Sequence, residues 1–545
     1  MNKAQLSEEH NWEAPLVFLL FFLFYLPTLC GISAAAPDSI DYLLRIDNTL
    51  GLNYPYNPLF HPHHLLFNGL ARLWLKFCRL TGVTSESDLL IAGFNALWGS
   101  GSLTIFYRLL RDRLKYHPFT ALLGTMLPAF SFGFWFYSVC VEVCIIPLFF
   151  LLLSFYLLTG KELDGKSLYL AGMFQALAVL LHQAHVLFLM VVLGAIWLGR
   201  ERLAITRVKA ISCYLISFIS GVAIPYLIVS FYILRFDSII KLWGWLTSYA
   251  HESANIHPLS LATLLKAAIG FGRSLIGANF IFAIPWAKEI INKFLSGHDL
   301  RDEVYLVRNL ETNGAYFLLA LSGIFFSLLI YAGFRLWRKS RLLNPESRDI
   351  FQLAGIWFAV YALFFIFWVG HNLEFWIPQS LCFWLMGLVI LAQSEKKARW
   401  LLTAAGLLLT LNFFGGLRFL RDKNNDFYYK KSAPLAGLVS KRDLIIVGQS
   451  INDEQSALES WNVELLYFYL LKYTPADVIN LNLFEEKSQL KKLLDHTLAE
   501  GHKIIIFEEA LGNLGRDDLQ TPWNNYVTRR QMVDLELNAV YILNP

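Results

Sequence analysis

Two aspartates directly after the first apolar run are the residues best placed to do chemistry. Asp38 and Asp41 follow the run 15–34 and stand three residues apart, so on a helix they would share one face. A carboxylate just outside a membrane span can accept a hydrogen bond from a hydroxyl and act as a general base, and partial desolvation would raise its pKa toward a useful value. The same position is typical of the N-terminal cap of a surface helix, so the sequence leaves both interpretations open.

Three histidines stand close together farther along the same segment. His61, His63 and His64 flank Pro62, a pattern that raises the hypothesis of a metal site. Pro62 imposes an extended backbone on the residue before it, and no cysteine or carboxylate stands beside the histidines at ligand spacing. We therefore expect them to hydrogen-bond a substrate or to begin a juxtamembrane helix. The sequence predicts no metal ligands and no cofactor; a divalent cation is compatible with the chemistry but is not indicated.

The segment that follows, Leu65 to Leu80, is amphipathic. It carries Arg72, Lys76 and Arg79 among leucine, phenylalanine and tryptophan residues. Such a pattern suits lipid headgroups or the phosphate of a lipid. Basic side chains that simply reach from an apolar surface to water give the same pattern, so this alternative also stays open.

Further polar residues stand at turns between apolar runs. Glu142 is the only carboxylate between Asp112 and Glu162, and an ionisable group at the end of a span is a candidate functional residue. Simple exposure to solvent at a turn is the alternative. Three residues are candidates of the second rank, at similar turns: His182, His185 and Glu374.

The composition indicates a membrane protein. Of the 545 residues, 56% are hydrophobic and only 16% are charged, whereas ordinary soluble domains carry about a quarter charged residues. This excludes a soluble multidomain enzyme and a disordered protein. The net charge of +4 is too small on so long a chain to suggest a nucleic-acid partner. A polytopic membrane protein with some water-exposed mass fits these values.

Apolar runs of about 18 residues or more are the signal for membrane spans. The stretch 168–199 contains His182 and His185 in its middle, and we interpret it as two short spans with these histidines at the tip. Only two crossings there place the four basic loops 108–115, 200–209, 335–341 and 396–399 on the cytoplasmic side. The sequence therefore predicts eleven spans and a cytoplasmic N-terminus. The other predicted spans are 15–34, 88–107, 118–138, 142–159, 211–234, 314–334, 349–369, 375–393 and 400–417.

The remaining segments then face outward, including a first outer loop, 35–87, and a long outer loop, 235–313. Residues 261–287 of the long loop are semi-apolar, and we expect helices that lie at the interface there, since a full crossing would invert every later loop. All the polar candidates converge on this outer face, and the spans are poor in charge. This favours an enzyme that works at the outer surface over a transporter, which needs polar groups near the middle of the membrane.

Residues 1–420 thus form the predicted transmembrane catalytic domain, and the tail, 421–545, changes character. Short apolar runs at 443–447, 478–481 and 503–507 alternate with helical patterns at 461–472 and 485–500. Such alternation predicts a small extracytoplasmic α/β domain with a parallel sheet. No glycine-rich fingerprint follows its first strand, so we expect a docking or acceptor-binding role and no dinucleotide site.

The order of these motifs resembles the GT-C superfamily of membrane glycosyltransferases, and within it the protein O-mannosyltransferase-like branch. One group of that branch carries Gly-Asp-Ser-Gly-Glu in its first loop, then His-Pro-Pro-Gly, then Ala-Glu-Val at the next outer turn. Residues 37–41, 61–64 and 141–143 stand in the matching places, and 374–378 resembles an aromatic-proline segment of the family. Pro37 and Ile40 replace the two glycines, Asp41 replaces the glutamate, and His63 replaces the second proline. The resemblance covers about residues 10–420.

This resemblance implies an inverting transfer of a sugar from a polyprenyl-phosphate donor to a hydroxyl of an unidentified protein, lipid or glycan outside the cytoplasm, of the hexosyl or mannosyl class. Asp38 is then the base, Asp41 tunes it or binds the acceptor, and Glu142 is the second acidic residue. The leaving lipid phosphate needs a cation. Three arginines are candidates for this role: Arg45, Arg72 and Arg235.

Other functions remain open at this stage. A flippase or exporter of a lipid-linked saccharide would show transport without new glycosidic bonds, and a non-catalytic envelope-assembly scaffold would tolerate loss of Asp38 and Glu142. A ligase or polymerase for longer glycans is close to the favoured hypothesis. The sequence contains no Asn-x-Ser/Thr sequon, which favours a bacterial inner membrane with the active site facing the periplasm or exterior.

Overall fold

The computed structural model describes residues 12–47, 57, 59–248, 256–294, 301–339, 343–392, 394, 397–448, 456–481, 487–510, 530–535 and 537–545. The chain divides into two compact units. The membrane unit is Met1–Gly31, Asn53–Phe280 and Asn313–Arg421, and the tail unit is Ile32–Leu52, Ile281–Thr312 and Asp422–Pro545.

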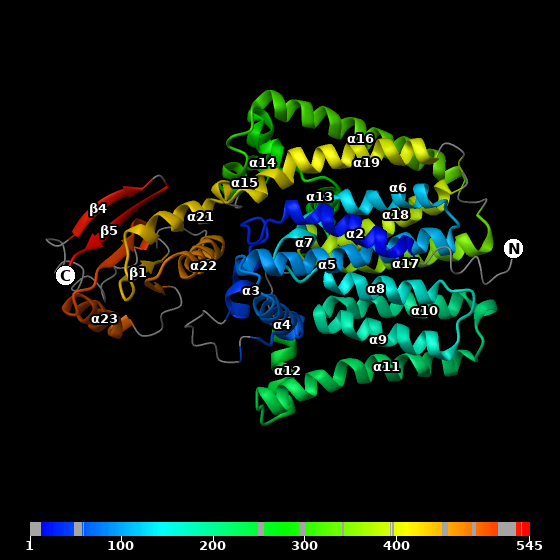
Figure 1. Cartoon of the computed structure of the whole chain (residues 1–545), viewed down its shortest axis with the longest axis horizontal. Helices are drawn as coiled ribbons and strands as arrows, with labels where there is room; N and C mark the ends of the chain where they lie inside the picture. The colour runs from blue at the N-terminus through cyan, green and yellow to red at the C-terminus, as the bar shows by residue number, and fades with distance from the viewer. Residues whose placement is uncertain are drawn as a thin grey trace. The chain divides into compact units, whose positions relative to one another are not determined.

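The membrane unit is helical, and its long helices run side by side in roughly one direction (Figure 1). Its α-helices are α2 (Glu13–Tyr25), α4 (Phe67–Leu80), α5 (Ser87–Arg108), α6 (Pro118–Phe130), α7 (Phe132–Val139), α8 (Ile146–Leu158), α9 (Gly165–Leu181), α10 (Leu189–Leu198), α11 (Arg207–Leu227), α12 (Ile239–Thr247), α13 (Leu261–Leu275), α16 (Thr312–Lys339), α17 (Pro345–Phe367), α18 (Ile377–Leu391), α19 (Lys397–Asn412) and α20 (Arg418–Arg421). Short 3₁₀ or π segments extend or join them: η1 (Leu26–Thr28), η2 (Pro62–His64), η3 (Leu109–Arg113), η4 (Gln183–Phe188), η5 (Arg200–Arg202), η6 (Ile228–Ile233), η9 (Ala278–Ala283), η11 (Leu373–Trp376) and η12 (Phe413–Leu417).

The chain is a polytopic α-helical membrane protein. Within the described residues, six helical segments are long and apolar enough to cross a membrane, and α6 with α7, bent by 73°, makes a seventh if the pair is one span. Four shorter apolar helices complete the set of segments predicted from the sequence. All eleven predicted runs are therefore helical, while eleven crossings stay a prediction. The six segments are Ser87–Arg113, Arg207–Ile233, Thr312–Phe334, Pro345–Phe367, Leu373–Leu391 and Lys397–Arg421.

Two details of the predicted spans are settled by local backbone geometry. The stretch 168–199 is two helical segments, as predicted, because the chain becomes extended at His182, where α9 ends and η4 begins. The predicted run 142–159 begins too early: α8 starts at Ile146, and Glu142 lies in the turn before it. The turn cannot be helical because Cys140, which opens it, is extended and forms a β-bridge with Gly31. Residues 340–341 and 396 of the predicted basic loops lie outside the described part of the chain.

A buried amide stabilises the break between α6 and α7. Asn412 of α19 donates from Nδ2 to the carbonyl oxygens of Phe130 (2.6 Å) and Leu275 (2.8 Å), and its Oδ1 accepts from the backbone N–H of Gly277 (2.9 Å). These backbone groups lie at helix ends, where no helical partner is available. Asn412 is fully buried, so it supplies hydrogen bonds that water cannot reach.

The predicted interfacial stretch 261–287 is not one continuous helix. It contains α13, then η9, and then the start of α14 (Pro285–Phe294), which belongs to the tail unit. None of these helices is among the segments long and apolar enough to cross a membrane. Their position at the interface remains a prediction.

The tail unit contains a five-stranded sheet in the order β2-β1-β3-β5-β4. Strands β1, β2 and β3 are parallel, as predicted, and β5 and β4 add an antiparallel hairpin that the sequence prediction missed. The hairpin carries exposed Gln531 and Asp534 on β4, so it lacks the continuous apolar run that marks a buried strand. The tail unit as a whole contains the elements α3 (Asp38–Asp47), α14, α15 (Arg301–Leu306), η13 (Lys423–Asn425), α21 (Phe427–Ser432), η14 (Ala433–Gly437), β1 (Leu444–Val447), α22 (Ser456–Tyr473), β2 (Asp477–Asn480), α23 (Lys487–Ala499), β3 (Ile504–Phe507), β4 (Arg530–Leu535) and β5 (Asn538–Leu543).

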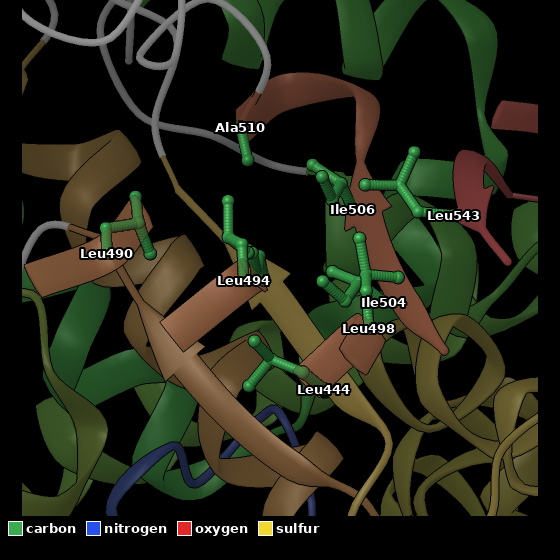
Figure 2. Packing of buried hydrophobic residues seen from close by; sticks show 9 residues of the cluster. Leu444, Leu490, Leu494, Leu498, Ile504, Ile506, Ala510 and Leu543 are labelled. Carbon is green, nitrogen blue, oxygen red and sulfur yellow. The ribbon is translucent and has the colours of Figure 1, made fainter. Parts of the chain in front are cut away.

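One face of this sheet is covered by α23. Leu490, Leu494 and Leu498 are spaced four residues apart and pack on the apolar side chains of β1, β3 and β5 (Figure 2). The predicted helix 485–500 is thereby confirmed over the described residues; 485 and 486 lie outside them.

Candidate functional site

Asp38 and Asp41 lie in the first turn of α3, as the spacing predicted. The turn before the helix is held by two serines: the Ser33 N–H donates to Ser39 Oγ (3.1 Å), and the Ser39 hydroxyl donates to the Ser33 carbonyl (3.3 Å). The opposite face of α3 is buried, so the two carboxylates keep a fixed, partly exposed position. A negative charge in the first turn also interacts favourably with the helix dipole.

Asp41 makes a short ion pair along the same helix. Arg45 Nε lies 2.6 Å from Asp41 Oδ2, and both side chains are about four-fifths buried. Arg45 is therefore held beside the carboxylates on α3. This arrangement competes with the role predicted for Arg45 as a cation for a lipid phosphate.

The structure adds a carboxylate that the sequence analysis missed. Glu464 of α22 interacts electrostatically with both Asp38 and Asp41, because α22 packs on α3 within the tail unit. Farther along the two helices, Lys472 Nζ lies 3.9 Å from Asp47 Oδ2. The predicted helix at 461–472 is correct, but nothing in its sequence pattern indicates that it packs beside a helix more than 400 residues earlier.

The environment of Asp38 shifts its protonation. Burial, and then repulsion from Asp41, raises the pKa of Asp38 to about 6; Glu464 acts in the same direction, while Arg45 opposes the shift. Burial and repulsion from Asp41 also raise the pKa of Glu464. A carboxylate with a pKa near 6 is mostly ionised at neutral pH and is basic enough to take a proton from a hydroxyl as that hydroxyl reacts.

Asp426 ties this part of the tail unit together. Its Oδ2 accepts from the Ala34 N–H (3.0 Å) and from the Tyr469 hydroxyl (2.6 Å), and its Oδ1 caps α21 through the N–H groups of Tyr428 and Tyr429. The turn before α3, the start of α21 and the last part of α22 thus share one partly buried carboxylate. This network fixes the position of α3 relative to Glu464.

Glu142 lies in the membrane unit, in the turn between α7 and α8, and its side chain is 1% exposed. The interpretation of Glu142 as a solvent-exposed turn residue is therefore wrong. Asn95 of α5 donates from Nδ2 to the carbonyls of Cys140 (2.8 Å) and Glu142 (2.6 Å), and Glu142 Oε2 accepts from the Val143 N–H (3.1 Å). Asn95 is fully buried, so these bonds hold the turn in one conformation.

Glu374 lies next to Glu142 in space. Cys144 Sγ is 3.9 Å from Glu374 Oε2, Asn372 Nδ2 donates to Glu374 Oε1 (2.8 Å), and one ligand atom each of Glu142, Cys144 and Glu374 lies within 4.8 Å of the others. Two carboxylates and a thiol at such distances can hold a metal ion such as zinc. This is the one group with that geometry in the described part of the chain, and the sequence analysis named no metal ligands there.

Gly31 is required where the chain passes the Glu142 turn. Its φ of +70° is the left-handed region, its carbonyl accepts from the Val141 N–H (3.0 Å), and a Cβ at this position would lie 2.5 Å from Asp88 Oδ2. Asp88 is fully buried and cannot easily move.

We expect Gly31→Ala to lower the free energy of unfolding by about 1–3 kcal/mol. Gly82→Ala is the matched control, because Gly82 has a φ of +83° but nothing within 4 Å of the added Cβ. Thermal unfolding of both variants in detergent separates the two contributions. Equal losses of Tm would show that the contact with Asp88 does not matter.

The structure brings the two histidine segments together within the membrane unit. The Tyr226 hydroxyl donates to the Pro62 carbonyl, Gln183 Nε2 donates to the Tyr226 hydroxyl (3.2 Å), and the Leu66 N–H donates to the Leu180 carbonyl (3.0 Å). His63 and His182 interact electrostatically. The sequence analysis placed these segments on one face of the membrane, and here they are neighbours.

Burial decides the charge of these histidines. It lowers the pKa of His63 to about 4 and that of His182 to about 3, the latter with repulsion from His63. They are therefore neutral at pH 7 and suited to hydrogen bonding, not to anion binding. Their neighbours His61 and His64 stack on each other at 4.4 Å between ring centroids, and His185 Nδ1 lies 3.1 Å from the Tyr361 hydroxyl.

The two other predicted cations lie apart from these groups in sequence and are partly or fully exposed. Arg72 lies on α4, whose buried face includes Phe67, Ala71 and Leu75, so the predicted amphipathic helix is present. Arg235 is exposed, with a φ of +56°, directly after η6.

Comparison with known proteins identifies the fold. No family model and no curated protein matches this sequence. The crystal structure of ArnT from Cupriavidus metallidurans bound to undecaprenyl phosphate matches with a TM-score of 0.53 at 10% identity, over 98% of this chain and 97% of that one. The apo structure of the same ArnT gives a TM-score of 0.54 at 10% identity, over 97% of each chain.

A zinc- and sulfate-containing structure of the Archaeoglobus fulgidus oligosaccharyltransferase matches at 12% identity over 97% of this chain and 73% of that one, but its TM-score of 0.45 is too low to carry an argument. At 10% identity the ArnT likeness shows the fold and not the activity. It extends over nearly the whole length of both chains, the C-terminal sheet included. This chain therefore has the GT-C membrane fold, with apolar helices followed by a small C-terminal α/β sheet domain.

Proposed function

We propose that this protein transfers a sugar, of the hexosyl or mannosyl class, from a polyprenyl-phosphate donor to an acceptor hydroxyl at the outer face of the membrane. The observation that carries the proposal is the Asp38 carboxylate, whose raised pKa and fixed position at the start of α3 suit a general base. The GT-C fold supports it, because an ArnT with the same fold was crystallised bound to undecaprenyl phosphate. We extend that class of lipid to the donor of this chain.

The proposed reaction needs one proton acceptor and one stabilised leaving group. The acceptor hydroxyl attacks the anomeric carbon, its proton passes to ionised Asp38, and the bond from that carbon to the phosphate oxygen breaks. The polyprenyl phosphate leaves with the electron pair, and the configuration at the anomeric carbon inverts. Attack and departure on opposite faces of the sugar account for the inversion.

In this proposal, cationic side chains stabilise the leaving phosphate and neutral side chains hydrogen-bond the sugar. The leaving phosphate needs a positive charge. Asp41 already holds Arg45, so Arg72 and Arg235 are the better candidates for the phosphate. The neutral histidines, with His63 and His182 foremost, are suited to hydrogen-bond sugar hydroxyls. We propose Glu142 as the second acidic residue, with Glu374 beside it.

The test is transfer of radiolabelled sugar from polyprenyl-phosphate donors in membranes that contain the full-length protein, with bacterial inner-membrane vesicles as the first host. Label that reaches an acceptor only when the protein is present supports the proposal. Movement of labelled donor across the bilayer without a new glycosidic bond would instead indicate a flippase. No transfer with any donor, together with normal envelope assembly in Asp38 and Glu142 variants, would indicate a scaffold.

The charges around Asp38 predict opposite shifts of the pH profile. Asp38 must be ionised to accept a proton, so transfer should rise as the pH increases through about 6. Glu464→Gln removes a negative neighbour, which lowers the pKa of Asp38 and should move this rising part of the pH profile to lower pH. Arg45→Gln removes the opposing positive charge, which raises the pKa of Asp38 and should move the rising part of the pH profile to higher pH. Shifts in the same direction, or no shift in either variant, would contradict the assignment of Asp38 as the base.

A further inference from the structure

A lateral cavity lies among three helices of the membrane unit, away from the polar residues discussed above. It has a volume of about 600 Å³ and is lined by the second half of α16, the second half of α18 and the first half of α19, with Leu127 of α6 and Phe351 of α17. The lining is mostly apolar and includes Phe325, Trp384 and Gly387. Figure 1 shows α16 and α19 running along each other at the border of this unit.

The cavity belongs to helices that are candidates for membrane spans. Thr312–Phe334, Leu373–Leu391 and Lys397–Arg421 are all long and apolar enough to cross a membrane. Ile330, Phe334 and Leu402 beside the cavity are more than half exposed, as lipid-facing side chains are. A water molecule needs two to four polar partners, which this lining does not offer along most of its length. Hydrocarbon from the membrane is therefore the filling that the surroundings supply.

Two basic residues lie in the chain next to residues that line one end of the cavity. Ser394 and Trp400 line it there, where α18 is followed by α19, and exposed Arg399 directly precedes Trp400. Lys397 lies in the same segment and donates to the carbonyl of Ala392 (3.0 Å). Tryptophan and basic residues are typical of the depth at which lipid headgroups lie, and arginine attracts anionic headgroups.

We propose that this cavity binds an anionic phospholipid, with one acyl chain among α16, α18 and α19 and the phosphate near Arg399. The site is independent of the proposed sugar transfer, since none of its residues is a candidate for catalysis. Its occupant holds α16 against the rest of the unit. A chain of apolar carbon fits the lining, and in this proposal Arg399, just outside the lining, selects the headgroup.

Two glycines provide a matched pair of variants. Gly387 lines the cavity and Gly406 does not, yet a Cβ at either position meets nothing within 4 Å. Both lie within helices, so phenylalanine at either site avoids a backbone clash. Gly387→Phe fills the cavity, whereas Gly406→Phe adds the same side chain elsewhere. Ala404→Phe is a second filling variant in case Gly387→Phe does not fold, because Ala404 also lines the cavity.

The experiment uses the full-length protein in detergent with phosphatidylglycerol that carries a photoactivatable diazirine in its acyl chain. We expect cross-links on peptides of α16, α18 and α19, about tenfold less labelling in Gly387→Phe or Ala404→Phe, and unchanged labelling in Gly406→Phe. Phosphatidylcholine with the same chain should label the protein less, and Arg399→Gln should abolish this difference. Equal labelling of the filled variants, equal labelling by the two lipids, or cross-links between copies of the chain would overturn the proposal.

Discussion

Asp38→Asn is expected to reduce sugar transfer by about 10²–10⁴-fold, the contribution typical of a general base. The amide has nearly the same shape as the carboxylate but cannot accept the hydroxyl proton. The variant also removes repulsion with Asp41 and Glu464, so the fold should be no less stable than that of the wild type. The measurement is the initial rate of transfer from a polyprenyl-phosphate sugar donor at pH 7.5, together with the unfolding temperature.

Asp47→Asn is the matched control for this loss. Asp47 lies on the same helix and pairs with Lys472 at 3.9 Å, but it does not share the Asp38 neighbourhood. We expect it to retain most of the transfer activity. Full activity of Asp38→Asn in a stably inserted protein would remove Asp38 as the base, and equal losses in both variants would point to a general effect of charge on α3.

In the proposed mechanism Glu142 is the second acidic residue, so Glu142→Gln, which removes its charge, is expected to reduce transfer by about 10²-fold or more. The substitution keeps the volume of a side chain that is 1% exposed, and its amide oxygen can still accept from the Val143 N–H. A loss of rate without a loss of Tm therefore separates a chemical role from a structural one. The exposed Glu162→Gln serves as the control for expression and insertion.

Variants of its neighbours decide how Glu142 acts. Glu142, Cys144 and Glu374 have the geometry to share a cation. If they do, Cys144→Ser and Glu374→Gln lose transfer along with Glu142→Gln, and added zinc restores activity after a chelator. If Glu142 acts alone, both neighbours tolerate substitution and a chelator has no effect. Wild-type rates in Glu142→Gln itself would contradict a role for this residue in the reaction.

In the proposed mechanism, the tail unit contributes to the catalytic site itself. The sequence predicts a docking or acceptor-binding domain, and α22 of this unit also places Glu464 beside Asp38 and Asp41. The partly buried Asp426 connects the turn before α3 to α21 and α22. In the proposed mechanism, this domain therefore sets the basicity of Asp38, which is what the Glu464 and Arg45 variants measure.

The sequence by itself determined the local elements, because they depend on short-range pattern. Apolar runs of about 18 or more residues predicted the helical segments of the membrane unit, and the helical pattern at 485–500 predicted α23. The three-residue spacing of Asp38 and Asp41 predicted one helical face, since a helix turns every 3.6 residues. The break at His182 followed from the placement of basic loops, and α9 does end there.

Only the tertiary structure decided which of these elements contact one another. Glu142 and Glu374 are more than 200 residues apart, as are the first-turn carboxylates and Glu464, and no local pattern encodes such pairs. The burial of Glu142 also needed the structure, because it depends on Asn95 and Gly31 holding a turn that looks exposed in sequence. Elements far apart in sequence come together because their apolar faces pack on each other. A short stretch of sequence shows only the periodicity of its own residues and not the element on which it packs. The chemistry of each group, in its pKa and partners, is therefore a property of the fold and not of the motif.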